Sequence, residues 1–404
     1  MKILWIKANK LLPLHSGGDI RSFHILKHLS SRNDVTFLSY YDGAEDKRYA
    51  AELSNYFPSS IALHTGKSST LVARGSDYLR KLPLPAPYAV SRFASPLVKA
   101  RINTLLETGS FDVVIADFLD AAINLPNAMA IPAVLFQHNV ESEIWRRHAD
   151  TETNPAKRLM YQFEFNKMLR YEQTIIRKFQ HVIAVSGHDR DLMQPWINSG
   201  ITTVPTGVDV KQYQAGSDHR DPAPIVMFVG AMDWEPNIDA VEFFSSEIWH
   251  FVVAAIPNAR FCIVGRNPDR RVRKLASNSI EITGRVESVA DYLHKAAVVV
   301  VPLRIGGGTR LKIYEAMAAG KAVVSTTVGA EGLNISPGRD IVIADDPRDF
   351  SDAIASLLKD RDLRHRYEHA ASETAGKYDW SIIAKKFGEV LESVVSLRFS
   401  PPKM

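Results

Sequence analysis

The chain has 404 residues, of which 46% are hydrophobic and 23% charged, and its formal net charge is +4. This composition is typical of a globular protein of two or three domains. Because the charge is modest and mixed along the chain, it does not indicate nucleic-acid binding. Cys262 is the only cysteine, which excludes an internal disulfide and a multi-cysteine zinc site.

The first apolar segment, Met1–Ile6, has the length of a strand and is flanked by lysines, unlike a cleavable signal peptide. No apolar run approaches the ~20 residues that a bilayer-spanning helix needs. We therefore expect a cytoplasmic protein, soluble or peripheral at the inner face of the membrane. Cys262 lies in the apolar run Arg260–Val264, where we expect a buried strand and a thiol that fills space.

Strand-like and helix-like segments alternate from the start of the chain, which predicts an α/β fold with parallel sheets. Two helices stand out in the first half, Ile20–Ser31 and Tyr161–Phe179. The longer one has a set of apolar residues that we expect in the core: Phe165, Met168, Leu169, Ile175 and Ile176. The strands expected in this half are Lys2–Ile6, Val35–Tyr40, Val113–Ala116, Ala133–Gln137 and His181–Val185.

The alternation of strand-like and helix-like segments begins again at Ile225, after the turn-rich stretch 205–224 that marks a linker. We expect a first domain at residues 1–205, a second at 206–376, and a C-terminal segment 377–404 with a helix at Trp380–Leu397. The expected strands of the second half are Ile225–Val229, Arg260–Val264, Ile280–Thr283, Val298–Val301, Ala322–Ser325 and Ile341–Ile343. The expected helices there are Asn237–Phe251, Val289–Ala296 and Arg310–Ala319.

A glycine-rich loop follows the strand Val298–Val301 and leads into a helix. Thr309 has the chemistry of an N-cap, and Gly320 that of a helix end. Arg310 and Lys312 then lie at the positive end of the helix dipole, which costs roughly 0.3–1 kcal/mol each. An anion held by backbone N–H groups and both side chains would explain this placement. The simpler alternative is a glycine-rich turn with solvated basic side chains.

Gly17 and Gly18 join the first strand to the first helix, where a ligand can approach the backbone and the helix dipole favours an anion. A tight turn is the alternative. This loop lacks the glycine pattern of the dinucleotide fingerprint. The glycine-rich loop before Arg310 lacks it as well, because the position of the third glycine falls on Leu311. A Walker A motif is also absent, because Ile61 occupies its first glycine position.

Polar residues follow several strands at the edge where doubly wound sheets bind ligands. His138 follows the strand Ala133–Gln137 and is suited to bind a sugar hydroxyl or stabilise developing charge, although a lone histidine is more often structural. Asp345 and Asp346 favour helix capping over a metal site. The remaining polar residues at this edge are Asp117, Asp120, Asn139, Glu141, Asp233, Glu235 and Asn237.

The segment Glu315–Val324 resembles the second half of the acidic motif of retaining glycosyltransferases of family 4, which have the GT-B fold. That motif has two glutamates separated by seven residues, and Gly307 stands here in place of the first. Other segments resemble the family in order and spacing: Pro205–Asp209, Gly230–Asn237, Thr283–Val286, Gly17-Gly18, His138 and the helix at Trp380. The order of elements also resembles exopolysaccharide-type sugar transferases.

The resemblance implies two doubly wound Rossmann-like domains facing a cleft, with the C-terminal helix crossing back to the N-terminal domain. It implies a nucleotide-diphosphate-sugar donor, a glycan or lipid-linked acceptor, no nucleic-acid partner, and neither a cofactor nor a metal. The catalytic residues implied are His138, Arg310, Lys312 and Glu315. The residues implied to bind the donor diphosphate are Gly17, Gly18, Gly306, Gly307, Gly308 and Thr309. Those implied to bind the nucleotide are Gly230, Asn237, Arg285, Val286 and Glu315. Those implied to bind the acceptor are Arg21, Asn139 and Asp117.

Two alternatives to a transferase remain at this stage: a nucleotide-sugar 2-epimerase, which shares the fold, and a non-catalytic sugar-nucleotide binding protein that lost activity with the first glutamate. Contact with anionic lipid is a further expectation, weighed against an ordinary helix or solvated loop. The residues suited to that contact are Arg80, Lys81, Leu82, Tyr88, Arg92 and Phe93.

Overall fold

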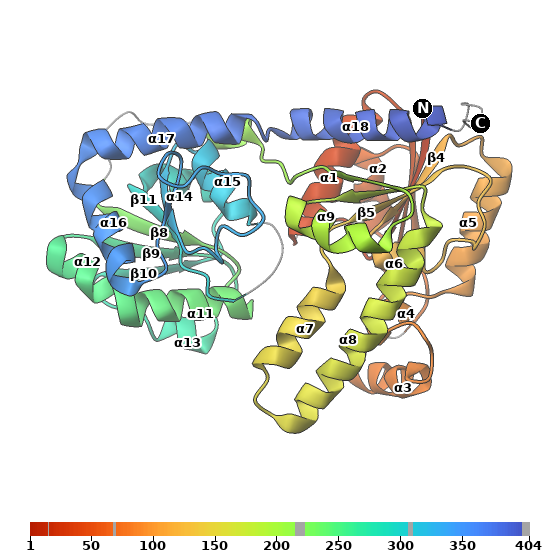
Figure 1. Ribbon diagram of the computed structural model, residues 1–404, viewed down its shortest axis with the longest axis horizontal. Coiled ribbons are helices and arrows are strands. Elements are labelled where there is room, and N and C mark those ends of the chain that lie inside the picture. Colours follow the sequence, from red (N-terminus) through yellow and green to blue (C-terminus); the bar gives the residue numbers. More distant parts are fainter. Residues whose placement is uncertain (15, 68–69, 215–222, 306–309, 398–404) are drawn as a thin grey trace. The chain divides into compact units, whose positions relative to one another are not determined.

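The computed structural model describes residues 1–14, 16–67, 70–214, 223–305 and 310–397. Contacts divide the chain into two compact units, one formed by Met1–Pro205 with Ile383–Met404 (unit 1) and the other by Thr206–Ile382 (unit 2). Each unit contains one parallel sheet with helices packed against it (Figure 1). The α/β prediction with two doubly wound sheets is confirmed.

The seven-stranded sheet of unit 1 has the order β3-β2-β1-β4-β5-β6-β7. Its direction of winding reverses between β1 and β4, and ligands of such sheets bind beyond the carboxyl ends of the strands at this point. The strands are β1 Lys2–Ala8, β2 Asp34–Tyr41, β3 Ser60–His64, β4 Val113–Asp117, β5 Ala133–Gln137, β6 His181–Ala184 and β7 Gly200–Thr203. Sequence patterns predicted the five central strands and missed the two edge strands, β3 and β7.

Helices of unit 1 include the hairpin of α7 and α8, which lie side by side and project away from the sheet (Figure 1). Met168, Ile175 and Ile176 are buried as predicted, whereas Phe165 and Leu169 are only partly buried, because this helix packs on one side only. The helices are α1 Gly17–Ser30, α2 Tyr49–Tyr56, α3 Leu71–Lys81, α4 Tyr88–Ser91, α5 Pro96–Thr108, α6 Leu119–Ala122, α7 Glu141–Thr151, α8 Pro155–Ile175 and α9 Gly187–Met193, with short 3₁₀ turns at Ile176–Lys178 and Gln194–Trp196.

Helix α18, Trp380–Leu397, contributes most of its length to unit 1. Phe387 is fully buried, and its ring stacks on Trp5 of β1 with 5.5 Å between centroids. The same ring meets Phe136 of β5 edge-on at 5.0 Å. The expected return of the C-terminal helix to the N-terminal domain is therefore confirmed.

The six-stranded sheet of unit 2 has the order β10-β9-β8-β11-β12-β13, so its winding reverses between β8 and β11. The strands are β8 Ile225–Val229, β9 Arg260–Val264, β10 Ile280–Gly284, β11 Val298–Val301, β12 Ala322–Ser325 and β13 Val342–Ile343. Cys262 is buried in β9 as predicted. All six strands match the predicted positions within two residues.

Helices of unit 2 are α10 Val210–Gln214, α11 Glu235–Phe243, α12 Trp249–Ala255, α13 Arg270–Arg273, α14 Val289–Lys295, α15 Leu311–Ala318, α16 Pro347–Lys359 and α17 Arg361–Gly376. A π-helical turn, Phe244–Ile248, interrupts the helix predicted over 237–251. Asp346 caps α16 by accepting the N–H groups of Arg348 and Asp349, which confirms its predicted role. None of the helices in the described ranges is both long and apolar enough to cross a membrane.

Candidate functional site

The basic helix start of unit 2 lies beside the point where its sheet reverses. Helix α15 begins at Leu311, with Arg310 at the cap position and no side-chain cap, so the helix starts one residue later than the predicted Thr309 cap requires. Arg310 is only 4% exposed. The predicted diphosphate residues Gly306, Gly307, Gly308 and Thr309 lie outside the described residues.

Lys312 contacts residues that follow β8. Its Nζ donates to Asn237 Oδ1 at 2.7 Å and lies 4.2 Å from the ring centre of Phe228. Asn237 in turn donates its Nδ2 to the carbonyl of Ala231 at 2.9 Å. A Cβ at Gly230 would lie 2.6 Å from Asn237 Nδ2 and 2.9 Å from Lys312 Nζ. Glycine at position 230 therefore leaves the space that this lysine occupies.

Lys312 is partly deprotonated near neutral pH. Burial and the neighbouring Arg310 lower its pKa to about 7, against the opposing effect of Glu315. Two adjacent, poorly hydrated cations disfavour each other's charge, and an anion bound between them would reverse this effect. The geometry thus fits an anion site, and the predicted pair of Arg310 and Lys312 is brought together.

Glu315, one turn further along α15, forms a hydrogen bond with the hydroxyl of Tyr213 from α10. Burial raises the pKa of Glu315, while Tyr213 and Lys312 oppose this rise. Sequence analysis missed Tyr213, which lies in the stretch interpreted as a linker and has no motif around it. Its ring positions the carboxylate that was predicted to bind the nucleotide.

Arg285 and Val286 follow β10, the edge strand of the same sheet. They lie at its carboxyl end like Lys312, but β9 and β8 separate β10 from β11. Arg285 is exposed and Val286 is half-buried. The structure thus places these two residues at the same carboxyl end of the sheet as Arg310 and Lys312, but three strand positions away.

His138 of unit 1 is held between a carboxylate and a guanidinium at the ends of β5, β4 and α1. Its Nε2 lies 2.7 Å from Asp117 Oδ1, and its Nδ1 lies 2.8 Å from a terminal nitrogen of Arg21. All three residues are at most 5% exposed. The structure thereby brings together three of the residues predicted from sequence.

The contacts of His138 fix its tautomer. A guanidinium only donates hydrogen bonds, so Nδ1 of His138 accepts from Arg21 and the ring proton resides on Nε2, which donates to Asp117. Burial, with smaller contributions from Arg21 and Lys7, lowers the pKa of His138 to about 4 against the opposing effect of Asp117. The imidazole is therefore neutral at physiological pH. Burial also lowers the pKa of Arg21 to about 10.

Asp117 is the centre of this network. Burial favours a higher pKa for its carboxyl, but Lys7 and His138 hold that pKa well below its usual range. Trp5 donates Nε1 to Asp117 at 3.0 Å, and the ammonium of Lys7 lies 3.5 Å from it. Sequence analysis missed Trp5 and Lys7. The available signal was a lysine at the carboxyl end of a buried strand, which is an unusual place for a charge.

Gly17 and Gly18 open helix α1, which Ser16 caps through a reciprocal capping box with Asp19. A Cβ at Gly18 would lie 3.4 Å from Nδ1 of His138. The predicted glycine loop therefore lies against the histidine network. The positive end of the α1 dipole lies here, so an anion at this position stays a prediction.

Asn139 follows His138 and is half-buried. Its carbonyl accepts from Gln137 Nε2 at 2.7 Å, and its side chain hydrogen-bonds to Glu141. Glu172 of α8 accepts the N–H groups of Glu141 and Ser142 at 2.8 and 3.0 Å and so caps α7. Burial raises the pKa values of Glu141 and Glu172 to about 7. Neither carboxyl had been assigned a role from sequence.

Comparison with known families identifies both halves of the chain. A model described as "Glycosyltransferase Family 4" matches residues 17–212, and one described as "Glycosyl transferases group 1" matches residues 223–360. The phosphatidyl-myo-inositol mannosyltransferase of Mycolicibacterium smegmatis is 28% identical over 78% of this chain and 80% of its own length.

Two further comparisons cover nearly the whole chain. An uncharacterized protein of the cps region of Klebsiella pneumoniae is 21% identical over 89% of this chain and 91% of its own length. The crystal structure of Anabaena HepE in complex with UDP has a TM-score of 0.65 at 15% identity, over 97% of this chain and 100% of that one. This structural likeness shows that the GT-B fold is shared. With both halves matched by family models, the chain belongs to glycosyltransferase family 4 and transfers a sugar from a nucleotide-sugar donor.

Proposed function

We propose that the protein transfers a sugar from a nucleotide-diphosphate sugar, with retention at the anomeric carbon, to a glycan or lipid-linked acceptor during exopolysaccharide or cell-surface glycan synthesis. The observation that carries this proposal is the pair Arg310 and Lys312 at the start of α15, with the Lys312 ammonium beside Gly230 at the reversal point of the unit 2 sheet. A buried guanidinium and a half-buried ammonium at a helix start suit the diphosphate of the donor.

Breaking the glycosidic bond places negative charge on the departing diphosphate. Arg310 and Lys312 are the residues that we assign to stabilise that charge, and removing one such donor typically costs about 2.7–4 kcal/mol of transition-state energy. The loop Gly306–Thr309 belongs to this proposal through its amides. Glu315 is proposed to bind a ribose or sugar hydroxyl, with its orientation held by Tyr213.

The acceptor hydroxyl forms its bond to the anomeric carbon on the face that the diphosphate leaves, and its proton passes to the departing phosphate oxygen. This route requires no side-chain base. It agrees with a neutral His138, whose two ring nitrogens are engaged by Arg21 and Asp117. We assign His138 a positioning role between Arg21 and Asp117, and we assign Arg21, Asn139 and Asp117 to the acceptor side of the reaction.

The relatives support an acceptor of the cell surface. One is named a phosphatidyl-myo-inositol mannosyltransferase and another lies in a capsule region. The exposed Leu79, Leu82 and Leu84, on and just after α3, agree with a peripheral membrane contact. The related expectation for Phe93 is wrong, since this ring is 5% exposed and belongs to the hydrophobic core.

The proposal is tested by measuring thermal shifts with a panel of nucleotide sugars, followed by mass spectrometry of products formed with extracts of lipid-linked and free glycans. We expect one donor to stabilise the protein and to yield a glycosylated acceptor with the donor's anomeric configuration. An epimerised free sugar without acceptor product would instead identify an epimerase. Donor binding without turnover on any acceptor would identify a sugar-nucleotide binding protein.

A further inference from the structure

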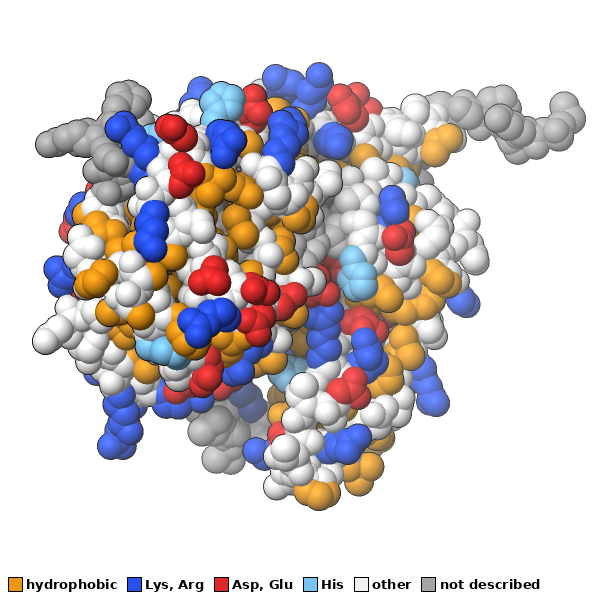
Figure 2. Space-filling model, turned by 60° about the vertical axis from the view of Figure 1, so that its left-hand side comes forward, with side chains coloured by type: hydrophobic (Ala, Val, Ile, Leu, Met, Phe, Trp, Pro, Cys, Tyr) orange, Lys and Arg blue, Asp and Glu red, His pale blue; other side chains and the backbone are white. Residues whose placement is uncertain are grey.

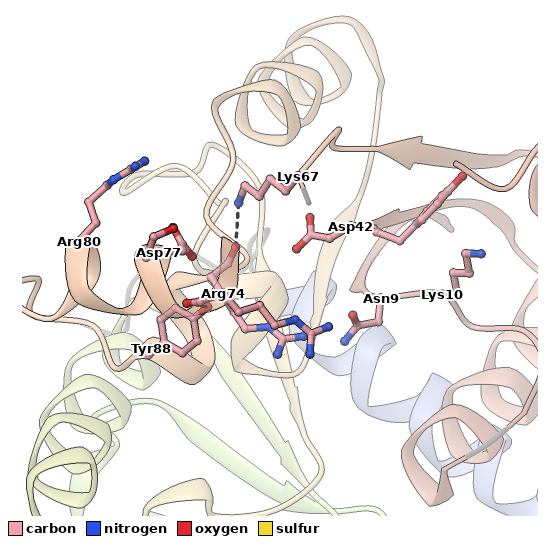
Figure 3. Close-up of a pocket in the computed structure, with 11 residues that line it drawn as sticks. Asn9, Lys10, Asp42, Lys67, Arg74, Asp77, Arg80 and Tyr88 are labelled. Carbon is pink, nitrogen blue, oxygen red and sulfur yellow. Dashed lines mark hydrogen bonds between the residues drawn. The ribbon is translucent and has the colours of Figure 1, made fainter. Parts of the chain in front are cut away.

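A basic pocket lies in unit 1, apart from the His138 network. It is a cavity of about 550 Å³ at the carboxyl ends of β1, β2 and β3. Its walls come from the segments after these strands and from α3 and α4 (Figure 3). The lining residues that carry charge are Lys10, Lys67, Arg74, Arg80 and Arg92 against Asp42 and Asp77, a difference of 5 − 2 = 3 positive charges.

The carboxylates of this pocket are largely engaged by other groups. Asp77 pairs with Lys81 at 2.9 Å, and Asp42 accepts a hydrogen bond from Thr65. Across the described residues, neither Arg74 nor Arg92 has a carboxylate within ion-pair distance. Arg74 points into the cavity in Figure 3, while Arg80 points away from it.

Lys67 is fixed in place at the wall of the cavity. Its Nζ donates to the carbonyls of Arg92 and Ala94 at 2.7 and 2.6 Å. An ammonium has three N–H donors, so one remains for a ligand. The two carbonyls tie the segment after β3 to α4, and this geometry is set before any ligand arrives.

Helices α3 and α4 are also held in place by a residue of α8. Glu164 of α8 is only 3% exposed, and its carboxylate accepts from the hydroxyl of Tyr78 and from the N–H of Tyr88, both at 3.3 Å. The hydroxyl of Tyr88 donates to the carbonyl of Arg74 at 3.2 Å. These contacts hold α3 and α4 against each other, so Arg74 of α3 and Arg92 after α4 both line the cavity without a bound anion.

We propose that this pocket binds a phosphate or diphosphate group of the acceptor substrate, so that the acceptor is a phosphate-bearing glycan or lipid. The inference rests on the proposed transferase function. Guanidinium groups bind phosphate through paired N–H donors, and Arg74, Arg92 and Lys67 supply three cations to the lining of one cavity. The ring of Tyr88 adds a surface on which a sugar can stack.

The sheet order relates the pocket to the reacting hydroxyl. β2, in the middle of the pocket, is three positions from β5, the strand that precedes His138. With strands about 4.8 Å apart, the span is roughly 14 Å. A phosphate in the pocket would thus leave the acceptor's next sugar unit directed along the sheet edge toward His138.

Inorganic pyrophosphate binding to the full chain tests the pocket itself. Because pyrophosphate also suits the donor site, the titration uses the Lys312→Met background, in which Arg74→Gln and Arg92→Gln are then combined. We expect at least a tenfold loss of affinity in the combined variant. Arg101→Gln, which removes an exposed arginine of α5 outside the pocket, should leave the affinity unchanged. Equal affinities in all these variants would overturn the proposal.

Two vesicle arms distinguish a lipid headgroup from a soluble phosphate. Vesicles of phosphatidylcholine with phosphatidylglycerol are compared with pure phosphatidylcholine, again with the double variant and Arg101→Gln. Loss of binding in the double variant supports the pocket in either arm. A loss in the vesicle arm indicates that the phosphate belongs to a lipid headgroup, and a loss only in the pyrophosphate arm indicates a soluble phosphate. The donor readout is separate: absence of nucleotide binding and transfer would contradict the transferase function, whereas normal transfer to phosphate-free and phosphorylated acceptors alike would contradict only the pocket.

Discussion

Lys312 couples its own protonation to anion binding. Its pKa of about 7 in the free protein means that the ammonium is partly neutral at physiological pH. A bound diphosphate favours the charged form and raises that pKa, so binding takes up part of a proton at pH values between the free and the bound pKa of Lys312. Below pH 7 the lysine is already charged, and this contribution is constant.

We therefore predict that affinity for UDP or GDP falls as the pH rises above 7, by up to about tenfold per pH unit. Isothermal titration in buffers of different ionisation enthalpy will report the proton uptake directly. Lys312→Arg keeps the charge at every pH and should remove the dependence, and Lys312→Met should weaken binding and flatten it. The same slope in Lys312→Met as in the unchanged protein would exclude this lysine as its source.

His138 makes a second prediction, about stability. Its pKa lies near 4 in the folded protein and near its ordinary 6.5 when unfolded. The unfolded state therefore binds more protons between these values, so the free energy of unfolding should fall as the pH drops from 6.5 to 4, by at most about 3 kcal/mol. His138→Gln should lose this part of the pH dependence, as measured by urea denaturation at several pH values.

Three buried carboxyls titrate in the opposite sense, because their pKa values are raised to about 7: Asp120, Glu141 and Glu172. They are present in both proteins, so the difference between the two stability profiles isolates His138. His188→Gln, at an exposed position of α9, serves as the matched control. A profile for His138→Gln parallel to that of the unchanged protein would contradict a neutral, buried imidazole.

At the scale of elements, the end of β8 and the start of α15 fit together only because position 230 lacks a side chain. Gly230→Ala would place a methyl group 2.6 Å from Asn237 and 2.9 Å from Lys312. We predict that nucleotide affinity falls at least tenfold, while overpacking reduces stability by only about 1–3 kcal/mol. Fluorescence titration with a nucleotide and urea denaturation measure the two effects.

Gly376→Ala is the control for this substitution, because a Cβ there meets nothing within 4 Å and the residue lies in the same unit. It should leave nucleotide affinity and stability close to those of the unchanged protein. If Gly230→Ala behaves like Gly376→Ala, Lys312 does not need the position observed here to bind the nucleotide.

The elements predicted from sequence are those whose burial is complete. β11 is a run of four valines with no exposed side chain, and such runs mark central strands of a parallel sheet. The missed strands β3 and β7 lie at the sheet edges and contain no fully buried residue. Their patterns of partly buried and polar residues resemble loops, so only the pairing with β2 and β6 defines them.

The position of a candidate site residue was predictable from the sequence where that residue follows a strand, as with His138, Arg310 and Lys312; their roles stay predictions. It was not predictable where a partner comes from elsewhere in the chain. Trp5 binds a carboxylate 112 positions away, and Tyr213 approaches its glutamate from another helix. Neither local pattern nor spacing carries that information, because these contacts arise only when the sheet and its helices assemble.

At the scale of the whole molecule, unit 1 depends on a helix from the far end of the sequence. Phe387→Ala removes a fully buried ring that contacts both Trp5 and Phe136, so we predict a loss of about 3–5 kcal/mol. Differential scanning calorimetry should show a lower melting transition for unit 1, and a nucleotide should raise only the transition of unit 2.

Leu397→Ala is the matched control on the same helix, since this leucine is 67% exposed. Its transitions should coincide with those of the unchanged protein. Equal effects of the two substitutions would show that α18 adds little to unit 1 beyond its presence as a helix.

The stacking of Phe387 on Trp5 also bears on biosynthesis. Ribosomes make chains from the N-terminus, so Trp5 emerges 387 − 5 = 382 residues before the ring that covers it. Throughout that interval one face of the first sheet leaves aromatic side chains exposed to solvent. The second sheet can fold during the same interval, because its folding does not require this ring. Nascent or prematurely terminated chains should consequently engage chaperones through their N-terminal half and be degraded from a state in which only the other sheet has folded.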